Sequence, residues 1–260
     1  MPSSYSTLIA PLLNIAMEAG KKIMDIYQDS SSWNVEVKDD KSPLTRADKE
    51  ANLIIEKGLK ALPLSFHIIS EEGKSTPYEE RKNWPVFWLV DPLDGTKEFI
   101  KRNGQFTVNI ALVEDHAPVL GVIYAPATKE LFFGIKGEGA YKQSSENVST
   151  RLSVSSRSTQ LVSVGSSSHA SEEEAAYLSK YDIASTIKSG SSLKFCRVAE
   201  GVADLYLRTG PTMEWDTAAG QCIAESAGAV MTTLDGTPFL YNKQSLLNTG
   251  FECKSTALAS

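Results

Sequence analysis

An apolar run that ends abruptly in two aspartates constrains this chain more than any other feature. Residues 86–90 (VFWLV) are short, continuous and rich in aromatic and β-branched side chains, which predicts a buried strand. Residues 91–96 (DPLDGT) follow at once. Because proline cannot extend a strand ladder and glycine permits a sharp turn, we expect the chain to leave the sheet here. Asp91 and Asp94 should then lie close together at a sheet end, partly desolvated.

Two such carboxylates need a compensating positive charge. Unit charges about 4 Å apart, at an effective dielectric near 20, repel by roughly 4 kcal/mol. Hard divalent cations are the usual partners of oxygen ligands. Neither a helix cap nor a solvated face accounts for DPLDGT directly after a fully apolar strand, so this segment predicts a metal site.

Composition excludes several classes of protein. The 260 residues, 42% hydrophobic and 22% charged, are typical of a globular chain with one large or two smaller domains. A net charge of −6 disfavours a nucleic-acid-binding surface. The three cysteines are widely spaced, which indicates a reducing compartment. No signal peptide or membrane-spanning run is visible. We therefore predict a cytoplasmic protein, with peripheral attachment to the cytoplasmic face of the inner membrane left open.

The hydrophobic pattern predicts two unlike halves. Helices are expected at about residues 5–28 and from Thr45 to Pro63, the second with Asp48 in a capping-box position. After a strand at 66–70, the segments VFWLV, FTVNIALV, VLGVIYAP and ELFFGI are too closely spaced for crossover helices, which predicts a largely antiparallel sheet. Strands then alternate with helices near 171–180, 191–200 and 217–227, an α/β pattern. We predict domains at residues 1–150 and 151–260.

Acidic residues stand at the ends of three elements. These are Glu71-Glu72 after one strand, Asp91 and Asp94 after the next, and Asp216 in WDTAAG. In isolation, a solvated turn explains the glutamates and an N-cap explains Asp216. The helix macrodipole would likewise account for Asp48 in its first turn.

Together these residues describe a phosphatase site. The carboxylates would bind two or three Mg²⁺ ions. Thr96 could orient a water, with Asp48 accepting from its hydroxyl, and the N–H groups of Gly95 and Thr96 could bind phosphate oxygens. No nucleophilic serine or cysteine motif accompanies the site, so we expect direct attack by water. His67, His116 and His169 are predicted to be structural or exposed.

The same motifs carry a family resemblance. DPLDGT, the upstream Glu71-Glu72 and the downstream WDTAAG resemble, in order and spacing, the lithium-sensitive, magnesium-dependent phosphatases typified by inositol monophosphatase. The longer strings DPLDGTKEFIKRNGQFTVNIAL and GSSLKFCRVAEGVADLYLR are similar to the CysQ branch, the bacterial 3′(2′),5′-bisphosphate nucleotidases. Inositol phosphatases usually have Thr-Asn-Phe where this chain has Lys-Glu-Phe at 97–99. The resemblance implies a layered αβαβα fold.

The resemblance also implies a role for each site residue. The magnesium ligands would be Glu71, Asp91, the main-chain carbonyl of Leu93, Asp94 and Asp216. Asp48 and Thr96 would activate the water, and Glu72 would support catalysis without binding a metal ion directly. Except for Asp91, the ligand residues would also contact the substrate, together with Gly95 and Thr96.

The expected substrate is adenosine 3′,5′-bisphosphate, hydrolysed to AMP. Its second phosphate needs a separate cation, for which Lys194 and Arg208 are candidates, with Ser191 as a neutral donor. The residues before Lys194 begin a helix, and a helix N-terminus favours an anion. Alternatively, Lys194 faces solvent and Arg208 forms a surface salt bridge. Lys97 and Lys101 are further possible contacts or simply solvated.

Other functions remain open at this stage. The chain could be an inositol monophosphatase, a fructose bisphosphatase or another small sugar phosphatase of the same family. It could also be a phosphonucleotide sensor without turnover, although a sensor has no need of the water-activating pair. The acidic net charge and the lack of a track of basic residues argue against nucleic-acid processing.

Overall fold

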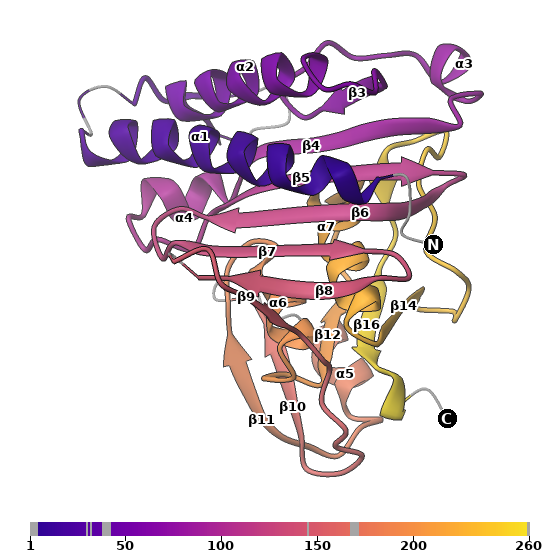
Figure 1. Ribbon diagram of the computed structural model, residues 1–260. Coiled ribbons are helices and arrows are strands. Elements are labelled where there is room, and N and C mark those ends of the chain that lie inside the picture. Colours follow the sequence, from indigo (N-terminus) through magenta and orange to yellow (C-terminus); the bar gives the residue numbers. More distant parts are fainter. Residues whose placement is uncertain are drawn as a thin grey trace.

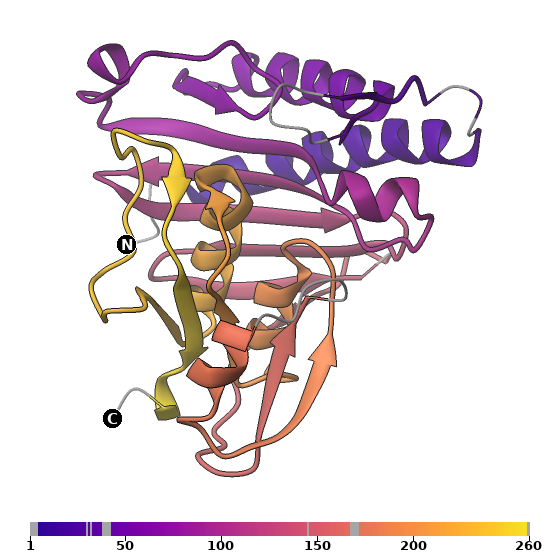
Figure 2. The ribbon, with the colours of Figure 1, turned by 180° about the vertical axis from the view of Figure 1, so that it is seen from behind.

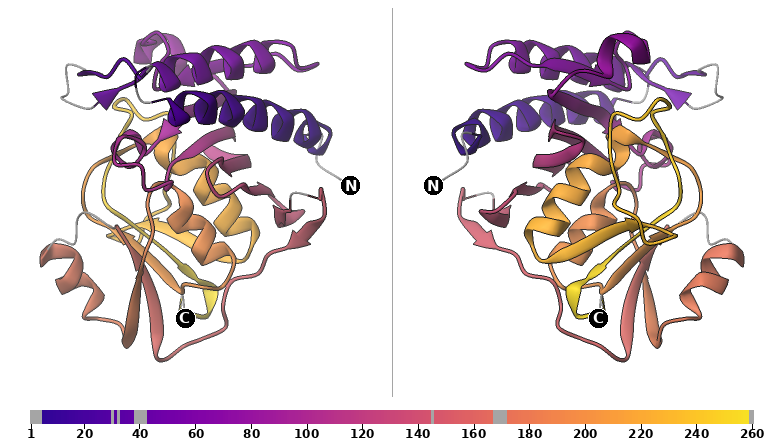
Figure 3. Two further views of the ribbon diagram at one scale, coloured as in Figure 1. Left: turned by 90° about the vertical axis from the view of Figure 1, so that its left-hand side faces the viewer. Right: turned by 90° about the vertical axis from the view of Figure 1, so that its right-hand side faces the viewer.

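Helices and sheets alternate in five layers in the computed structural model, which describes residues 5–29, 31, 33–37, 43–144, 146–166 and 172–258. The order is α1 and α2, a seven-stranded sheet, α6 and α7, a five-stranded sheet, and α5 (Figures 1 and 3). The predicted layered αβαβα fold is confirmed. In the described part of the chain, no helix combines the length and apolar character needed to cross a membrane.

Two long helices cover the outer face of the first sheet. Helix α1 (Ile9–Gln28), preceded by the short η1 (Ser6–Leu8), and α2 (Arg46–Lys60) match the two predicted helices. The capping box of α2 is also confirmed, because Asp48 Oδ2 accepts from Thr45 N at 2.7 Å and Thr45 Oγ1 at 2.6 Å. These bonds hold the buried Asp48 carboxylate at the start of the helix.

The first sheet is antiparallel except at one edge. Its strands lie in sequence order, and only β3 and β4 pair in parallel. They are β3 (His67–Ser70), β4 (Val86–Asp94), β5 (Thr107–Glu114), β6 (Ala117–Ala125), β7 (Glu130–Ile135), β8 (Gly139–Gln143) and β9 (Ser149–Arg151). Helix α3 (Tyr78–Arg81) lies in the β3–β4 connection. Alternate residues of the central strands enter the two hydrophobic cores on opposite faces, as Leu89 and Val90 do. Burial on both faces explains why the strands are apolar throughout rather than alternating.

The end of β4 differs from the expectation that the chain leaves the sheet after Val90. The strand continues to Asp94, and its pairing with β5 passes from Asp91↔Asn109 to Asp94↔Thr107 through an irregularity. The chain advances three residues on β4 while it advances two on β5, so β4 contains one extra residue, which is a β-bulge. Proline is tolerated there because no ladder bond is needed from it. The bulge leads into α4 (Thr96–Ile100) through Gly95, whose φ of +92° favours glycine.

The second half forms a mixed sheet in the order β11-β10-β12-β16-β14. Its elements are β10 (Leu161–Gly165), α5 (Glu172–Leu178), β11 (Ile183–Lys188), α6 (Leu193–Ala199), β12 (Leu205–Arg208), α7 (Glu214–Ser226), β14 (Ala229–Thr233) and β16 (Phe251–Ser255). The three helices match those predicted near 171–180, 191–200 and 217–227. Sheet one ends at Arg151 and β10 begins at Leu161, near the expected boundary, although the division into two domains stays a prediction.

Helix α7 is packed closely between the two sheets. A Cβ on Gly121 would lie 2.5 Å from Ala219 O, and one on Gly134 would lie 2.8 Å from Ile223 Cα. Only glycine therefore allows the helix to approach β6 and β7 so closely. This packing places the first turn of α7 at the end of the first sheet.

Two two-stranded sheets and the helix η3 lie outside these larger sheets. The hairpin β1 (Glu36–Val37) with β2 (Pro43–Leu44) lies between α1 and α2, β13 (Thr212–Met213) pairs with β15 (Leu247–Asn248), and η3 (Thr256–Leu258) follows β16. His67 is exposed and stacked on Trp84, whereas His116 Nδ1 contacts Tyr241 O at 2.8 Å. Both fit the structural or exposed prediction, and His169 lies outside the described residues.

Candidate active site

A cleft of about 340 Å³ gathers the acidic residues from three separate segments. Glu71 follows β3, Asp91 and Asp94 end β4, and Asp216 lies in the first turn of α7. All five residues expected as metal ligands line it, including Leu93, as do Gly95 and Thr96. Glu72 is half-buried in the neighbouring turn and lines neither this cleft nor the one beside it.

The bulge at the end of β4 sets the directions of its polar groups. Leu93 N donates to Asp91 Oδ1 at 3.0 Å, which closes a tight local turn. The Leu93 side chain is buried, while its carbonyl oxygen lies 3.4 Å from Thr96 Oγ1. The main-chain oxygen of Leu93 therefore lies near Thr96 in the lining of the acidic cleft, and the leucine side chain gives no indication of this position.

Asp48 and Thr96 meet although 48 positions separate them in the sequence. Thr96 Oγ1 donates to Asp48 Oδ1 at 3.2 Å. The other carboxylate oxygen of Asp48 is held by Thr45 at the helix cap. Desolvation raises the pKa of Asp48, although the hydrogen bonds from Thr45 lower it. One carboxylate thus caps α2 and orients the threonine at the cleft.

The acidic cleft is electrostatically costly without a cation. Desolvation, and then the charges of Glu71, Asp94 and Asp216, raise the pKa of Asp91 well above its usual range. Desolvation and the charge of Asp94 do the same for Asp216. Desolvation raises the pKa of Asp94 to about 6, although Lys194 and the Ser192 N–H lower it. Mutual repulsion of this kind is what divalent cations relieve.

The donor set suits hard cations that keep some water. Carboxylate and carbonyl oxygens are the ligands of Mg²⁺, which is usually held by only one or two carboxylates and several waters. Over the described ranges, no group of three His, Cys, Asp or Glu side chains is arranged to hold an ion alone. Main-chain oxygen from Leu93 and water would have to complete each coordination shell.

A second cleft of about 190 Å³ adjoins the first and carries the positive charge. The two clefts share Asp94, Gly95, Lys97, Glu98, Pro211 and Asp216. Lys194 and Arg208 line the second cleft only, and neither is a solvent-facing surface residue. Desolvation lowers the pKa of Lys194 to about 8, although the charge of Asp94 raises it. Arg208 Nε is buried without a hydrogen-bond partner. Lys101 lines neither cleft.

The turn before α6 contacts the acidic residues and also lines the second cleft. Its N-terminus does hold an anion, but that anion is Asp94, whose Oδ2 accepts from Ser192 N at 2.7 Å. Ser191 lines the second cleft, yet its hydroxyl donates to the carbonyls of Asp94 and Gln105 at 2.7 and 3.0 Å. The Ser191 hydroxyl thus holds the turn in place at the wall of the second cleft.

Sequence reasoning missed the residues that hold Asp94. Asn109 Nδ2 lies 3.5 Å from Asp94 Oδ2, and Asn109 Oδ1 accepts from Ser192 Oγ at 2.7 Å. Ser192 Oγ also contacts Thr107 Oγ1 at 2.8 Å. The only available signal was the polar pair Thr107 and Asn109 in an otherwise apolar strand.

The fold and this site define a class of protein. The chain belongs to the inositol monophosphatase family, whose model matches residues 4–259. Members of that family are metal-dependent phosphatases. Its relatives include the 3′(2′),5′-bisphosphate nucleotidases CysQ of Salmonella typhimurium, 45% identical over 94% of this chain and 98% of the relative, and of Escherichia coli K12, 44% identical over the same shares.

Solved structures agree with this assignment. The crystal structure of CysQ from Bacteroides thetaiotaomicron, 42% identical, has a TM-score of 0.84 and covers 97% of this chain and 98% of that one. A Thermotoga maritima IMPase, 23% identical, has a TM-score of 0.79 over 97% of this chain and 94% of its own, and shares the fold. The chain therefore has the fold of the family over almost its entire length.

Proposed function

We propose that this chain is a Mg²⁺-dependent, Li⁺-sensitive phosphatase that hydrolyses the 3′-phosphate of adenosine 3′,5′-bisphosphate to give AMP and phosphate. The observation that carries the proposal is the pair of adjoining clefts, one acidic and one with Lys194 and Arg208. A substrate with two separated phosphates matches this division. The names of the CysQ relatives support the same substrate.

The chain's own residues have distinct roles in the proposed reaction. The chemistry that bound Mg²⁺ supplies is charge neutralisation of the phosphate and a lower pKa for water. Glu71, Asp91, Leu93 O, Asp94 and Asp216 would hold the ions, and Glu72 would support them from the neighbouring turn. Thr96 donates to Asp48 and can accept a hydrogen bond from the attacking water, which orients it. Gly95 and Thr96 would offer main-chain N–H groups to the scissile phosphate.

The second phosphate would bind in the cationic cleft. Lys194 Nζ donates to Ser191 O at 2.5 Å, so the ammonium is already held at the cleft wall. Arg208 Nε is a buried donor without a partner, and a phosphate oxygen would satisfy it. We propose Lys194 and Arg208 as the principal contacts of this phosphate, with Ser191 in the cleft wall as a neutral donor.

The alternatives predict other behaviour. The substrate of an inositol or sugar monophosphatase has no second phosphate for Lys194 and Arg208 to bind. A sensor without turnover has no use for the Thr96–Asp48 hydrogen bond. We also propose a cytoplasmic location, and the comparisons with relatives give no support for peripheral membrane attachment.

A substrate panel tests the proposal directly. Phosphate release is measured from adenosine 3′,5′-bisphosphate, inositol 1-phosphate and fructose 1,6-bisphosphate in Mg²⁺, with and without Li⁺. We expect a clear preference for the nucleotide and loss of its turnover in Li⁺. Preference for inositol 1-phosphate would overturn the nucleotide assignment but leave the metal site standing, and binding without turnover would favour the sensor.

Replacing Lys194 with alanine should raise KM for adenosine 3′,5′-bisphosphate by about tenfold to a hundredfold. The reason is that a hydrogen bond to a charged group contributes about 1.5–3 kcal/mol, and 1.4 kcal/mol is a factor of ten. KM for adenosine 3′-monophosphate, which lacks the second phosphate, should change little. Lys129, exposed in the β6–β7 turn, provides the matched Lys129→Ala control. An equal rise in KM for both substrates would refute the assigned contact.

A further inference from the structure

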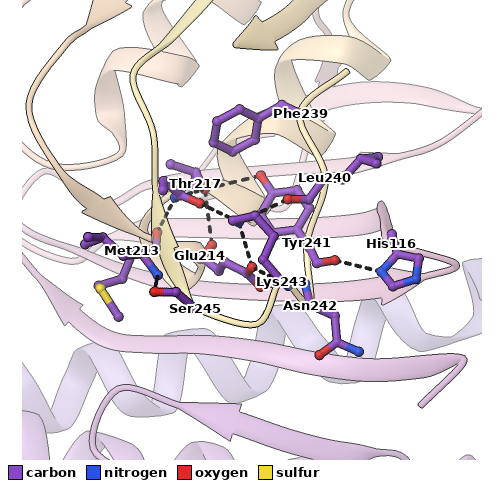
Figure 4. Close-up of polar contacts among 12 residues, drawn as sticks. His116, Met213, Glu214, Thr217, Phe239, Leu240, Tyr241, Asn242, Lys243 and Ser245 are labelled. Atoms are coloured by element: carbon purple, nitrogen blue, oxygen red, sulfur yellow. Dashed lines mark hydrogen bonds and ion pairs between the residues drawn. The ribbon is translucent and has the colours of Figure 1, made fainter. Parts of the chain in front are cut away.

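Glu214 is a buried carboxylate that the proposed reaction does not use. It lies two residues before Asp216, none of its surface is exposed, and it lines neither cleft. Glu214 Oε2 accepts from Asn242 N at 2.7 Å, and Oε1 accepts from Lys243 N at 3.0 Å and Lys243 Nζ at 2.6 Å (Figure 4). Three donors from one short segment therefore converge on this single side chain.

That segment, residues 240–248, is called here the strap. In Figure 2 it lies in the yellow-gold part of the chain, at the left, where the loop rises toward the strands of the first sheet. Lys243 Nζ also donates to Asn248 Oδ1 at 2.9 Å. Asn248 Nδ2 donates in turn to Met213 O at 2.8 Å and Thr217 Oγ1 at 3.1 Å. The strap therefore contacts α7 on both sides of Asp216.

A short chain of hydrogen bonds connects the ion pair of Glu214 and Lys243 to the proposed metal site. Met213 N donates to Asp216 Oδ2 at 2.8 Å, so the position of Met213 sets the direction of that carboxylate. Met213 is held through Asn248 and the β13–β15 pairing, and Glu214 N donates to Leu246 O at 2.9 Å. Any shift of the strap would be transmitted to Asp216 through these bonds.

The strap is also tied to the segment that connects the other acidic residues. The buried Arg81 donates from Nη1 to Asn242 Oδ1 at 2.7 Å and Lys243 O at 2.8 Å, and from Nη2 to Gln244 O at 3.0 Å. Arg81 belongs to α3, in the connection between β3 and β4. The ends of those strands carry Glu71 and Asp91.

We propose that Glu214 and Lys243 are positioning residues that hold Asp216 in place for metal binding. The inference rests on the proposed metal site. Asp216 lies among like charges, and their repulsion would move a loosely held first turn of α7 away from the cleft. Glu214 is fully buried and its partner Lys243 is partly exposed, and burying the carboxylate is costly, but its hydrogen bonds specify one geometry. Here that geometry directs a metal ligand before the cation arrives.

The test is the near-isosteric substitution Glu214→Gln, with Mg²⁺ binding as the measurement. Two quantities are read: the Mg²⁺ concentration that gives half the maximal rate, and the rise in Tm that Mg²⁺ causes without substrate, which reports binding to the folded state. We expect the half-saturating Mg²⁺ concentration to rise at least tenfold and the rise in Tm to shrink. The double variant Glu214→Gln/Lys243→Met should raise the half-saturating Mg²⁺ concentration by less than the product of the effects of Glu214→Gln and Lys243→Met, because the two side chains share one hydrogen bond.

Asp204→Asn is the matched control. Asp204 is also fully buried, accepts from Val162 N at 2.7 Å, and pairs with the partly exposed Arg157 at 2.9 Å. It precedes β12, at the opposite end from Arg208, and lines neither cleft. This control should lower Tm without changing the Mg²⁺ dependence.

Two results would overturn the inference. One is an unchanged Mg²⁺ dependence in folded Glu214→Gln protein. The other is an equal change in Asp204→Asn, which would mean that general loss of stability explains the effect. If Mg²⁺ has no effect on the Tm of the unaltered protein, the proposed metal site fails as well, and that outcome is distinguishable from the other two.

Discussion

Asp94→Asn should lower kcat/KM for adenosine 3′,5′-bisphosphate at least about a thousandfold in saturating Mg²⁺. Asp94 lines both clefts, is a proposed ligand of the ions, and accepts at Oδ2 from the N–H at the start of α6. The amide keeps the shape and one oxygen acceptor but loses the negative charge. Weaker metal binding and poorer charge neutralisation should together cost about 4 kcal/mol of transition-state stabilisation, which is a thousandfold in rate.

The experiment needs a folded variant and a neutral comparison. Circular dichroism and Tm establish that Asp94→Asn is folded, which we expect because the Ser192 N–H can still donate to the amide oxygen. Asp235→Asn, in an exposed turn, should retain the unaltered rate. A folded Asp94→Asn protein with a rate within a few-fold of the unaltered chain would refute the whole acidic constellation.

Exhaustive chelation of divalent metal should reduce turnover to the background rate. Without cations, the carboxylates in the acidic cleft repel one another, and desolvation with that repulsion raises the pKa of Asp91 and Asp216 well above the usual range. Among the described residues that line the cleft, Lys97 is the one cation, and a single exposed lysine cannot offset both the carboxylates and a phosphate. Returning Mg²⁺ should restore the rate, and Li⁺ alone should not.

Two measurements make this prediction specific. Metal content after chelation is determined by elemental analysis, so that residual activity can be compared with residual metal. The Tm of the metal-free protein shows that the fold is retained, and readdition of Mg²⁺ should raise it. Undiminished turnover by protein shown to be free of metal would refute the proposed chemistry, whatever the substrate.

Local chemistry made much of the fold predictable. The capping box of α2, the buried stripes of the two long helices and the closely spaced strands all depend on residues near one another in sequence. The bulge at 91–94 was missed, because proline and glycine indicate a departure from the ladder without showing that pairing resumes at Asp94. The expectation of a strand end was therefore wrong by four residues.

The candidate site divides in the same way. The acidic residues were recognisable because carboxylates directly after an apolar strand have no structural explanation. The residues that hold these carboxylates in place were not recognisable, because their contacts join distant parts of the sequence. Ser192 and Asp94 are 98 positions apart, and Glu214 and Lys243 are 29 apart. Ser191 lines the cationic cleft, but the two main-chain carbonyls that accept from its hydroxyl lie 97 and 86 positions away and gave no sequence signal.

The amino-acid sequence by itself determined the oxygen-rich donor set, the family and the order of the elements, because these follow from residue chemistry and local periodicity. Only the tertiary structure decided that two clefts adjoin, that Lys194 is buried in the second, and that the strap braces Asp216. The physical reason is distance along the chain. Packing brings remote segments into contact, and burial then sets which charges need a partner.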